Sequence, residues 1–362
     1  MNTHYLDREM TALEALKIPY CELQVRRGHK LVYSARSGEE GVGKRFFLYS
    51  ATKVMTVSAA MRLCQEGKLE LDAPVSRYLP AYADAFIMKN GIPCPTENTM
   101  TVRHVFTMSA GLDYRLDTPF IREAASQPGA NTRSIVNAFI KRPLSFSPGD
   151  RFQYSLCHDV LGAVIEAVSN MSLAEYMRKT VFEPLGMEHT SFAYDKSELA
   201  PKYVYNNGVY KPDALENAYI IAPGYYSGGA GAVSNADDLS LFADALACGG
   251  AAWNGYSLLR PETIDLMRTD QASAVLRNNN FSCAAGEEFS YGLGVHTLVK
   301  PLGETPAPLG AFGWDGAAGA YLMSDPQNAL SIAFLMHVHG WTQIRPVFHK
   351  PIRDAVYATL KL

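Results

Sequence analysis

Ser50 and Lys53 lie three residues apart in the segment Phe46-Phe47-Leu48-Tyr49-Ser50-Ala51-Thr52-Lys53-Val54. This segment opens an apolar-periodic helix, and residues i and i+3 of a helix share a face, so Lys53 could reach the Ser50 hydroxyl. A serine hydroxyl is a weak nucleophile at neutral pH and needs a basic partner. A helix N-terminus also directs backbone N–H groups towards a developing oxyanion. The pattern predicts acyl transfer through Ser50.

The elements around this motif follow from periodicity. Residues 21–25 and 30–35 are apolar-rich runs separated by Arg26-Arg27-Gly28-His29, which predicts a hairpin. Residues 71–210 are mostly helical in pattern, with one helix over 131–141 and another over 159–168. Residues 291–299, 317–324 and 329–337 are strand-like, and both chain ends are amphipathic helices.

Strand signals at both ends of the chain and helical signals between them predict an α+β fold. We expect one antiparallel sheet flanked by the terminal helices, with a mostly helical domain inserted into it. The expected boundaries are residues 1–60 and 215–362 for the discontinuous sheet domain and 61–214 for the helical domain. The active site would lie at the seam between the two domains.

The composition excludes several classes of protein. Of 362 residues, 48% are hydrophobic and 19% are charged, which is typical of a globular protein with a substantial core. The net charge of −3 contains no long run of one sign, so we expect neither nucleic acid nor a membrane surface as a partner. There is no transmembrane pattern and no signal-peptide pattern, which predicts a cytoplasmic location. The six cysteines lack paired spacing, so free thiols are expected, with no metal and no cofactor.

Several further segments resemble the serine β-lactamase and penicillin-binding-protein superfamily, whose nucleophile motif is S-x-x-K. Together with Ser50-Ala51-Thr52-Lys53 they appear in the family's order along nearly the whole chain. They are the segments 66–75, 101–112, 147–155 with 161–162, 182–187 and 228–234. The resemblance implies a β-lactamase/transpeptidase-like fold.

The class C branch of this superfamily uses a tyrosine as a second base in a Y-x-N motif. Tyr154 stands at that place, with Leu156 instead of the asparagine. A literal Tyr205-Asn206-Asn207 also occurs, but it lies in a polar, Gly/Pro-flanked stretch that we interpret as a loop. The resemblance therefore implies Tyr154 as the partner of Lys53.

The family's K-T-G strand motif is replaced here by Trp314-Asp315-Gly316. This combination is similar to the β-lactamase-like carboxylesterases, known as family VIII esterases. A lysine on this strand would suit the carboxylate of a lactam or peptide, whereas Trp314 offers an apolar wall and Leu156 removes a polar contact. We expect an oxyanion hole formed by the N–H groups of Ser50 and Ala317, with Gly316 allowing a close approach.

Each candidate has a structural alternative. Ser50 could cap its helix, Lys53 could be solvated, and Tyr154 and Trp314 could be core residues. His158 suggests a Ser–His pair, but no G-x-S-x-G elbow exists. His337 and His339 share a strand face without an evident third metal ligand. The glycines at 228–231 are expected to allow tight packing near the site.

These features predict a serine hydrolase that forms an acyl-enzyme, most simply a carboxylesterase acting on small neutral esters. A β-lactamase or D,D-peptidase would share the nucleophile and differ at the strand motif. A transacylase is a further enzymatic alternative, and a non-catalytic binder with the penicillin-recognition fold belongs to another class. The expected partner is a small-molecule ester or lactam.

Overall fold

The computed structural model describes residues 3–272, 288–300 and 307–362. The strand predicted at 317–324 is found at Tyr321–Asp325 (β12). The strand predicted at 291–299 is two short strands, Phe289–Tyr291 (β9) and His296–Leu298 (β10). The helices are α1 (His4–Ala15), α2 (Thr52–Gln65), α3 (Val102–Phe106), α4 (Pro119–Ser126), α5 (Thr132–Val136), α6 (Cys157–Ser169), α7 (Leu173–Met177), α8 (Glu183–Leu185), α9 (Ala236–Ala247), α10 (Pro261–Arg268) and α12 (Lys350–Leu360), with shorter turns η1 (Tyr49–Ala51), η4 (Phe139–Lys141), η5 (Arg178–Phe182) and η7 (Arg345–His349). The strands are β1 (Tyr20–Arg27), β2 (Lys30–Gly38), β3 (Phe46–Phe47), β4 (Phe86–Lys89), β5 (Ile92–Pro95), β6 (Lys202–Asn206), β7 (Val209–Asp213), β8 (Val233–Ser234), β9 (Phe289–Tyr291), β10 (His296–Leu298), β11 (Phe312–Asp315), β12 (Tyr321–Asp325), β13 (Leu330–Met336) and β14 (Val338–His339).

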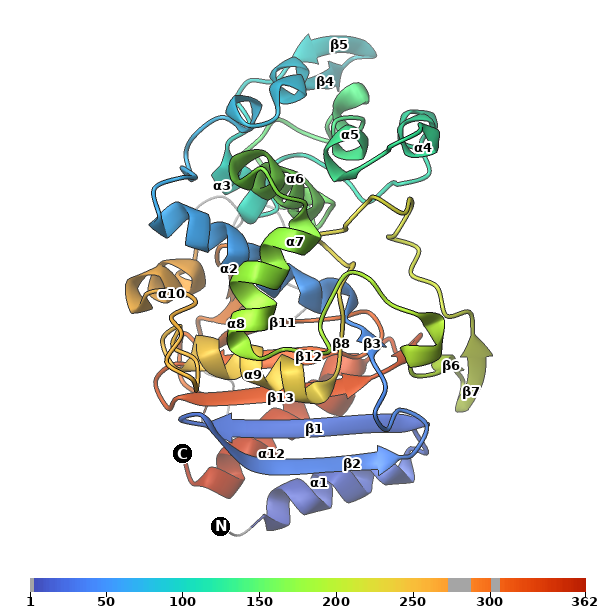
Figure 1. The fold of residues 1–362 in the computed structure, drawn as a ribbon, viewed down its shortest axis with the longest axis vertical. Coiled ribbons are helices and arrows are strands. Elements are labelled where there is room, and N and C mark those ends of the chain that lie inside the picture. Colours follow the sequence, from blue (N-terminus) through green and yellow to red (C-terminus); the bar gives the residue numbers. More distant parts are fainter. Residues whose placement is uncertain (1–2, 273–287, 301–306) are drawn as a thin grey trace.

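The central sheet is built from both ends of the chain, as predicted. In the described part of the chain its seven strands have the order β2-β1-β13-β12-β11-β10-β9, and every pairing is antiparallel. The β1–β2 pairing confirms the predicted hairpin. Figure 1 shows this sheet in the lower half of the molecule and the helical segment above it.

Helices cover both faces of the sheet. The hydroxyl of Ser324 donates to the carbonyl of Ala243 in α9, whereas the carboxylate of Asp325 accepts from the hydroxyl of Tyr357 in α12. Because successive strand residues point to opposite faces, α9 and α12 lie on opposite sides of the sheet. The N-terminal helix α1 packs against α12 and β2, so the terminal helices flank the sheet together.

The middle of the chain is less helical than predicted. Residues 71–210 contain the hairpin β4–β5, whose turn holds Asn90 and Gly91 at φ values of +52° and +81°. Asn-Gly is a strong signal for such a two-residue turn, and the helical interpretation of this segment was wrong here. The single helix predicted over 131–141 is also wrong, because α5 ends at Val136 and only a short turn, η4, precedes Pro143.

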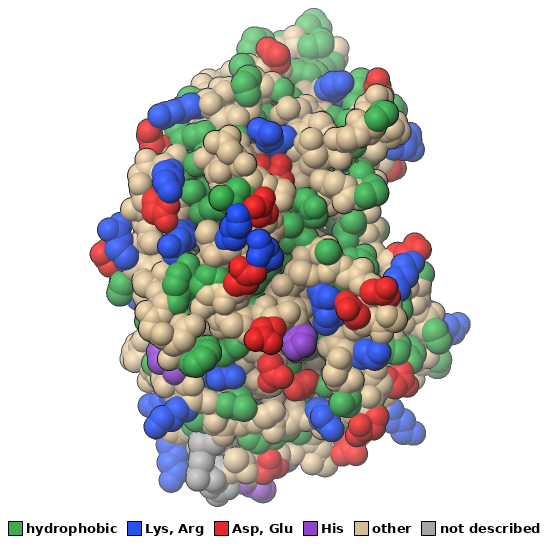
Figure 2. Space-filling model, in the orientation of Figure 1, with side chains coloured by type: hydrophobic (Ala, Val, Ile, Leu, Met, Phe, Trp, Pro, Cys, Tyr) green, Lys and Arg blue, Asp and Glu red, His purple; other side chains and the backbone are tan. Residues whose placement is uncertain are grey.

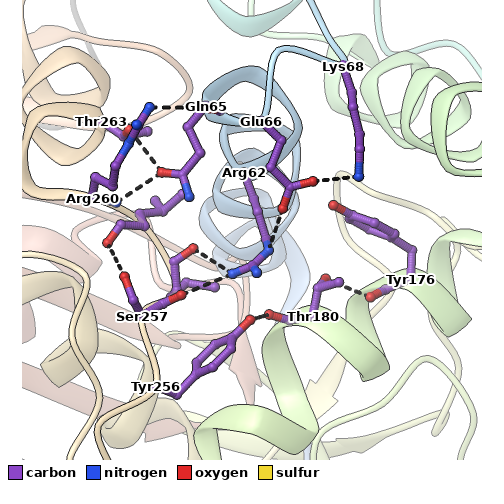
Figure 3. Close-up of polar contacts among 12 residues, drawn as sticks. Arg62, Gln65, Glu66, Lys68, Tyr176, Thr180, Tyr256, Ser257, Arg260 and Thr263 are labelled. Atoms are coloured by element: carbon purple, nitrogen blue, oxygen red, sulfur yellow. Dashed lines mark hydrogen bonds and ion pairs between the residues drawn. The ribbon is translucent and has the colours of Figure 1, made fainter.

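Helix α2 connects the two halves of the molecule and is anchored at its C-terminal end. Arg62 donates from Nη1 to the carbonyls of Ser257 (3.0 Å) and Leu258 (3.1 Å), and Gln65 Oε1 accepts from the backbone N–H of Arg260 (3.0 Å) and from Thr263 Oγ1 (3.0 Å) (Figure 3). These contacts fix the helix that begins beside Ser50.

The surface in Figure 2 carries lysine and arginine side chains interspersed with aspartate and glutamate. Within the described residues, no helix is both long and apolar enough to cross a bilayer.

Candidate active site

Ser50 lies in a sharp turn between β3 and α2. Tyr49 precedes it with φ at +45°, a left-handed conformation that is uncommon for a bulky residue. Tyr49 is buried, and its ring makes an edge-on contact with His339 at 4.7 Å, which holds the turn in place. Strained backbone of this kind is often retained at functional sites.

Lys53 is completely buried on the first turn of α2. Its Nζ atom donates to Ser50 Oγ at 3.2 Å, to Tyr114 Oη at 2.8 Å and to the Gly229 carbonyl at 2.7 Å. The local i, i+3 spacing thus places the amine beside the hydroxyl. A buried amine needs such partners, because burying a polar group without hydrogen bonds is destabilising.

Tyr154 lies beside Lys53, and its hydroxyl forms a hydrogen bond with Trp314. Lys53 Nζ is 4.7 Å from the centre of the Tyr154 ring. The hydroxyl of Tyr154 accepts a hydrogen bond from Trp314 Nε1 at 3.1 Å, and the two rings are stacked at 5.5 Å. Tyr154 therefore lies beside the Lys53 amine and lines the same pocket as Ser50.

Tyr114 is the functional candidate that the sequence analysis missed. Burial, and then the neighbouring Tyr154, Asp159 and Tyr219, raise the pKa of Tyr114 well above its ordinary value, so the phenol stays protonated. It lies between the Lys53 amine and Tyr154. The sequence signal that could have identified Tyr114 is its position just after residues 101–112, one of the segments that resemble the superfamily.

The pocket in front of Ser50 has a volume of about 350 Å³ and a largely aromatic wall. Its lining residues are Ser50, Phe152, Tyr154, Trp314, Asp315, Gly316, Ala317, Trp341, Ile344 and Arg345. The predicted residues Ser50, Tyr154, Trp314, Gly316 and Ala317 thus meet in one pocket. Leu156 is buried at the start of α6 and is not among the lining residues.

Gly316 explains how β11 approaches the serine. A methyl group on Gly316 would lie 2.2 Å from the carbonyl oxygen of Leu48, which is too close for any side chain. The N–H of Ala317 has no backbone acceptor within the described residues, and it lies at the pocket with Ser50. This arrangement leaves both predicted oxyanion donors at the same pocket.

Arg345 is a cation at this pocket that the strand motif did not reveal. Its Nη2 donates to Asp315 Oδ1 at 2.8 Å, and its Nε lies 2.7 Å from Asp315 Oδ2. Burial alone would raise the pKa of Asp315, but Arg345 and His349 outweigh it and hold the pKa below its ordinary value. The charge of Arg345 is thus matched by a carboxylate of the protein.

The remaining predicted features lie away from the serine or pack behind it. His158 contacts the Phe106 carbonyl, and His337 contacts that of Ala200. Gly228 and Gly229 pack closely against α6, as expected for tight packing near the site.

Among the described residues, His29, Asp244 and Cys248 form the group that could hold a metal, with ligand atoms within 4.8 Å of one another. In the structure, His29 Nδ1 and Asp244 Oδ2 already pair at 2.8 Å, and this group does not line the Ser50 pocket. Five cysteines are free thiols, and Cys283 lies outside the described residues.

Comparison with known proteins agrees with this fold. The family model described as beta-lactamase matches residues 7–356, so the chain belongs to the beta-lactamase family. It is 28% identical over 381 residues to esterase EstB of Burkholderia gladioli, covering 97% of this chain and 92% of EstB.

Solved structures give the same result. The structure of EstCE1, described as a hydrolase with promiscuous acyltransferase activity, aligns with a TM-score of 0.79 and 28% identity over 98% of this chain and 99% of EstCE1. Unliganded simvastatin synthase from Aspergillus terreus aligns with a TM-score of 0.77 at 22% identity, over 98% of this chain and 97% of the synthase, which supports the fold alone. The β-lactamase/transpeptidase-like fold predicted from the sequence is confirmed, and the chain is a hydrolase of this family.

Proposed function

We propose that the protein is a serine carboxylesterase that acts on small neutral esters through an acyl-enzyme on Ser50. The observation that carries this proposal is the buried Lys53 amine 3.2 Å from Ser50 Oγ, beside a pocket that Ser50 and Trp314 line. The names of the relatives EstB and EstCE1, an esterase and a hydrolase, support the same class of reaction.

The reaction follows from this geometry. Ser50 Oγ attacks the ester carbonyl carbon while its proton passes to the Lys53–Tyr154 pair. The carbonyl oxygen becomes an oxyanion between the N–H groups of Ser50 and Ala317. The C–O bond to the alcohol then breaks, and the alcohol leaves with the proton. Water attacks the acyl-enzyme in the same way, which releases the acid and restores Ser50.

The preference for neutral esters rests on the pocket wall. Trp314, Phe152 and Trp341 are apolar surfaces, and the nearby cation Arg345 is already paired with Asp315. A substrate carboxylate would have to compete with that internal carboxylate. This arrangement disfavours the β-lactamase and D,D-peptidase alternatives.

The test compares wild type with Ser50→Ala on p-nitrophenyl esters of increasing acyl length and on a chromogenic cephalosporin. Ester hydrolysis should fall by about 10³-fold or more in the variant. Ser126→Ala, on the exposed end of α4, is the matched control and should keep full activity.

Intact mass spectrometry should show one phosphonate adduct on wild type and none on Ser50→Ala. Undiminished ester turnover by Ser50→Ala, or turnover of the cephalosporin alone, would exclude the proposal. Adding a short alcohol would reveal a transacylase by the ester that forms.

A further inference from the structure

Asp159 is a carboxylate buried directly behind the Lys53 amine. It lies in the first turn of α6 and is 1% exposed. Its Oδ1 accepts hydrogen bonds from Tyr225 Oη at 2.7 Å and from Ser227 Oγ at 2.6 Å. Burial raises the pKa of Asp159, and the hydrogen bonds, the Lys53 charge and the backbone N–H of Gly229 lower it in part. Because burying a carboxylate costs free energy, we expect Asp159 to have a structural or functional role.

Gly229 connects Asp159 to Lys53. The backbone N–H of Gly229 donates to the Asp159 carboxylate, and its carbonyl accepts from Lys53 Nζ at 2.7 Å. A methyl group on Gly229 would lie 2.6 Å from Asp159 Oδ2 and 3.4 Å from Lys53 Nζ. The two charged groups therefore lie within roughly 6 Å of each other, a range in which an opposite charge stabilises an ionised group.

We propose that Asp159 is the positioning residue of the catalytic amine: its carboxylate supplies a counter-charge behind Lys53, and through Gly229 it holds Nζ against Ser50. This inference rests on the proposed esterase function. It assigns Asp159 no contact with substrate, because Asp159 is not among the residues that line the pocket.

Other ionisable groups face this pair, and they do not replace the carboxylate. They are phenols, a thiol and an imidazole, namely Tyr82, Tyr114, Tyr154, Tyr219, Tyr225, Cys157 and His158. Burial, with Lys53 as a second cause, lowers the pKa of His158 to about 3, so this imidazole is neutral. Asp159 is therefore the anion beside Lys53 among the groups that face it.

The test is the pH profile of kcat/KM for a neutral ester in wild type and Asp159→Asn. The amide keeps the shape of the side chain and an oxygen that can accept from Tyr225 and Ser227, but it removes the charge. We expect kcat to fall about tenfold or more with KM changed less than twofold. The limb of the profile that reports on Lys53 should move to lower pH by roughly one unit, because the ammonium loses its counter-charge.

Which limb moves identifies the role of Lys53. A shift of the basic limb means that the charged form of Lys53 is needed, as a counter-charge role for Asp159 requires. A shift of the acidic limb would mean that the neutral amine takes the serine proton, and it would overturn the proposal, because the Asp159 charge would then oppose catalysis. Ser227→Ala is the matched control, since it removes one hydrogen bond to Asp159 and keeps the charge. It should lower the melting temperature without moving either limb.

Superimposable profiles for Asp159→Asn and wild type, or an equal loss of activity at every pH, would overturn the proposal. Should Asp159→Asn not fold, Gly229→Ala tests the same link, because its methyl group would separate the two charges. Its kcat should fall with KM retained, and an unchanged kcat would overturn the proposal. Failure of the proposed function gives a different result: wild type itself would then show no Ser50-dependent ester hydrolysis.

Discussion

The indole Nε1 of Trp314 donates a hydrogen bond to the hydroxyl of Tyr154 at 3.1 Å. The sequence resemblance assigns Trp314 to the strand position where the family's K-T-G motif would supply a lysine. A neutral N–H donor therefore stands in for a cation next to the phenol. This exchange keeps a group that can orient Tyr154 and stabilise negative charge on its oxygen, while it removes a positive charge from the pocket.

Replacing Trp314 by phenylalanine should lower kcat by about tenfold or more, because one hydrogen bond that supports the reacting groups is lost. KM for a neutral ester should change little, since the aromatic wall remains. Trp341→Phe is the control: it alters the same pocket, and its indole nitrogen has no hydrogen-bond partner among the described residues. Equal effects of the two substitutions on steady-state kinetics would refute a special role for the Trp314 N–H.

Asp315→Asn should change substrate preference. The substitution leaves Arg345 without its carboxylate partner, so Arg345 becomes available to a substrate carboxylate. We expect the ratio of kcat/KM for a succinyl monoester to that for the matching neutral ester to rise about tenfold.

The same variant should be less stable by about 1–3 kcal/mol, because breaking this partly buried ion pair leaves the Arg345 charge uncompensated. Asp72→Asn serves as the control, since it breaks the more exposed pair with Arg103 and should not alter the substrate ratio. If the succinyl ester gains nothing over the neutral ester, internal pairing of Arg345 does not set the preference.

Gly316→Ala should separate β11 from the serine turn. Its methyl group would contact the Leu48 carbonyl oxygen at 2.2 Å, so the strand must move. We expect labelling of Ser50 by a phosphonate probe to slow by about 10²-fold, because displacing the oxyanion donors weakens transition-state stabilisation. Ala318→Gly, one residue beyond the predicted oxyanion donor, should label at close to the wild-type rate. Wild-type labelling of Gly316→Ala would show that this close approach is not required.

Stability should depend on pH through four buried histidines. Burial lowers the pKa to about 3 for His158, His296 and His337, and to about 4 for His349. In the unfolded chain each histidine titrates near about pH 6.5. Between these values the unfolded state binds more protons, so the free energy of unfolding falls as pH falls below about 6.5. The decrease is up to about 1.4 kcal/mol per pH unit for each histidine.

Urea unfolding at pH 7.5, 6.0 and 5.0 measures this dependence. The His296→Gln variant should have a smaller slope, by up to about 1.4 kcal/mol per pH unit, since one of these groups no longer takes up a proton. His4→Gln, at an exposed position in α1, should keep the wild-type slope. A denaturation midpoint that is the same at pH 5.0 and pH 7.5 would contradict the prediction.

Local patterns allowed the sequence to predict much of this structure. The Ser50–Lys53 contact depends on one helical turn, and the β1–β2 hairpin on two adjacent runs. Tyr114 was missed because its role arises from a contact with Lys53 across a long separation, and Asp159 because it faces Lys53 only through Gly229. No local pattern encodes either arrangement. Arg345 was missed for the same reason, since η7 brings it to the pocket from the far end of the chain. The β4–β5 hairpin is different, because its Asn90-Gly91 signal was present in the sequence.

The central position of β1 has a consequence for biosynthesis. This strand pairs with β13, which follows it by 303 residues (330 − 27) along the chain and is therefore made much later. A ribosome must therefore release the whole segment from β1 to β13 before the sheet can close, and non-local pairing of this kind is slow. Until then one side of the β1–β2 ribbon is an unpaired edge that can join neighbouring chains. We expect nascent or C-terminally truncated chains to depend on chaperones in a way that the finished protein does not.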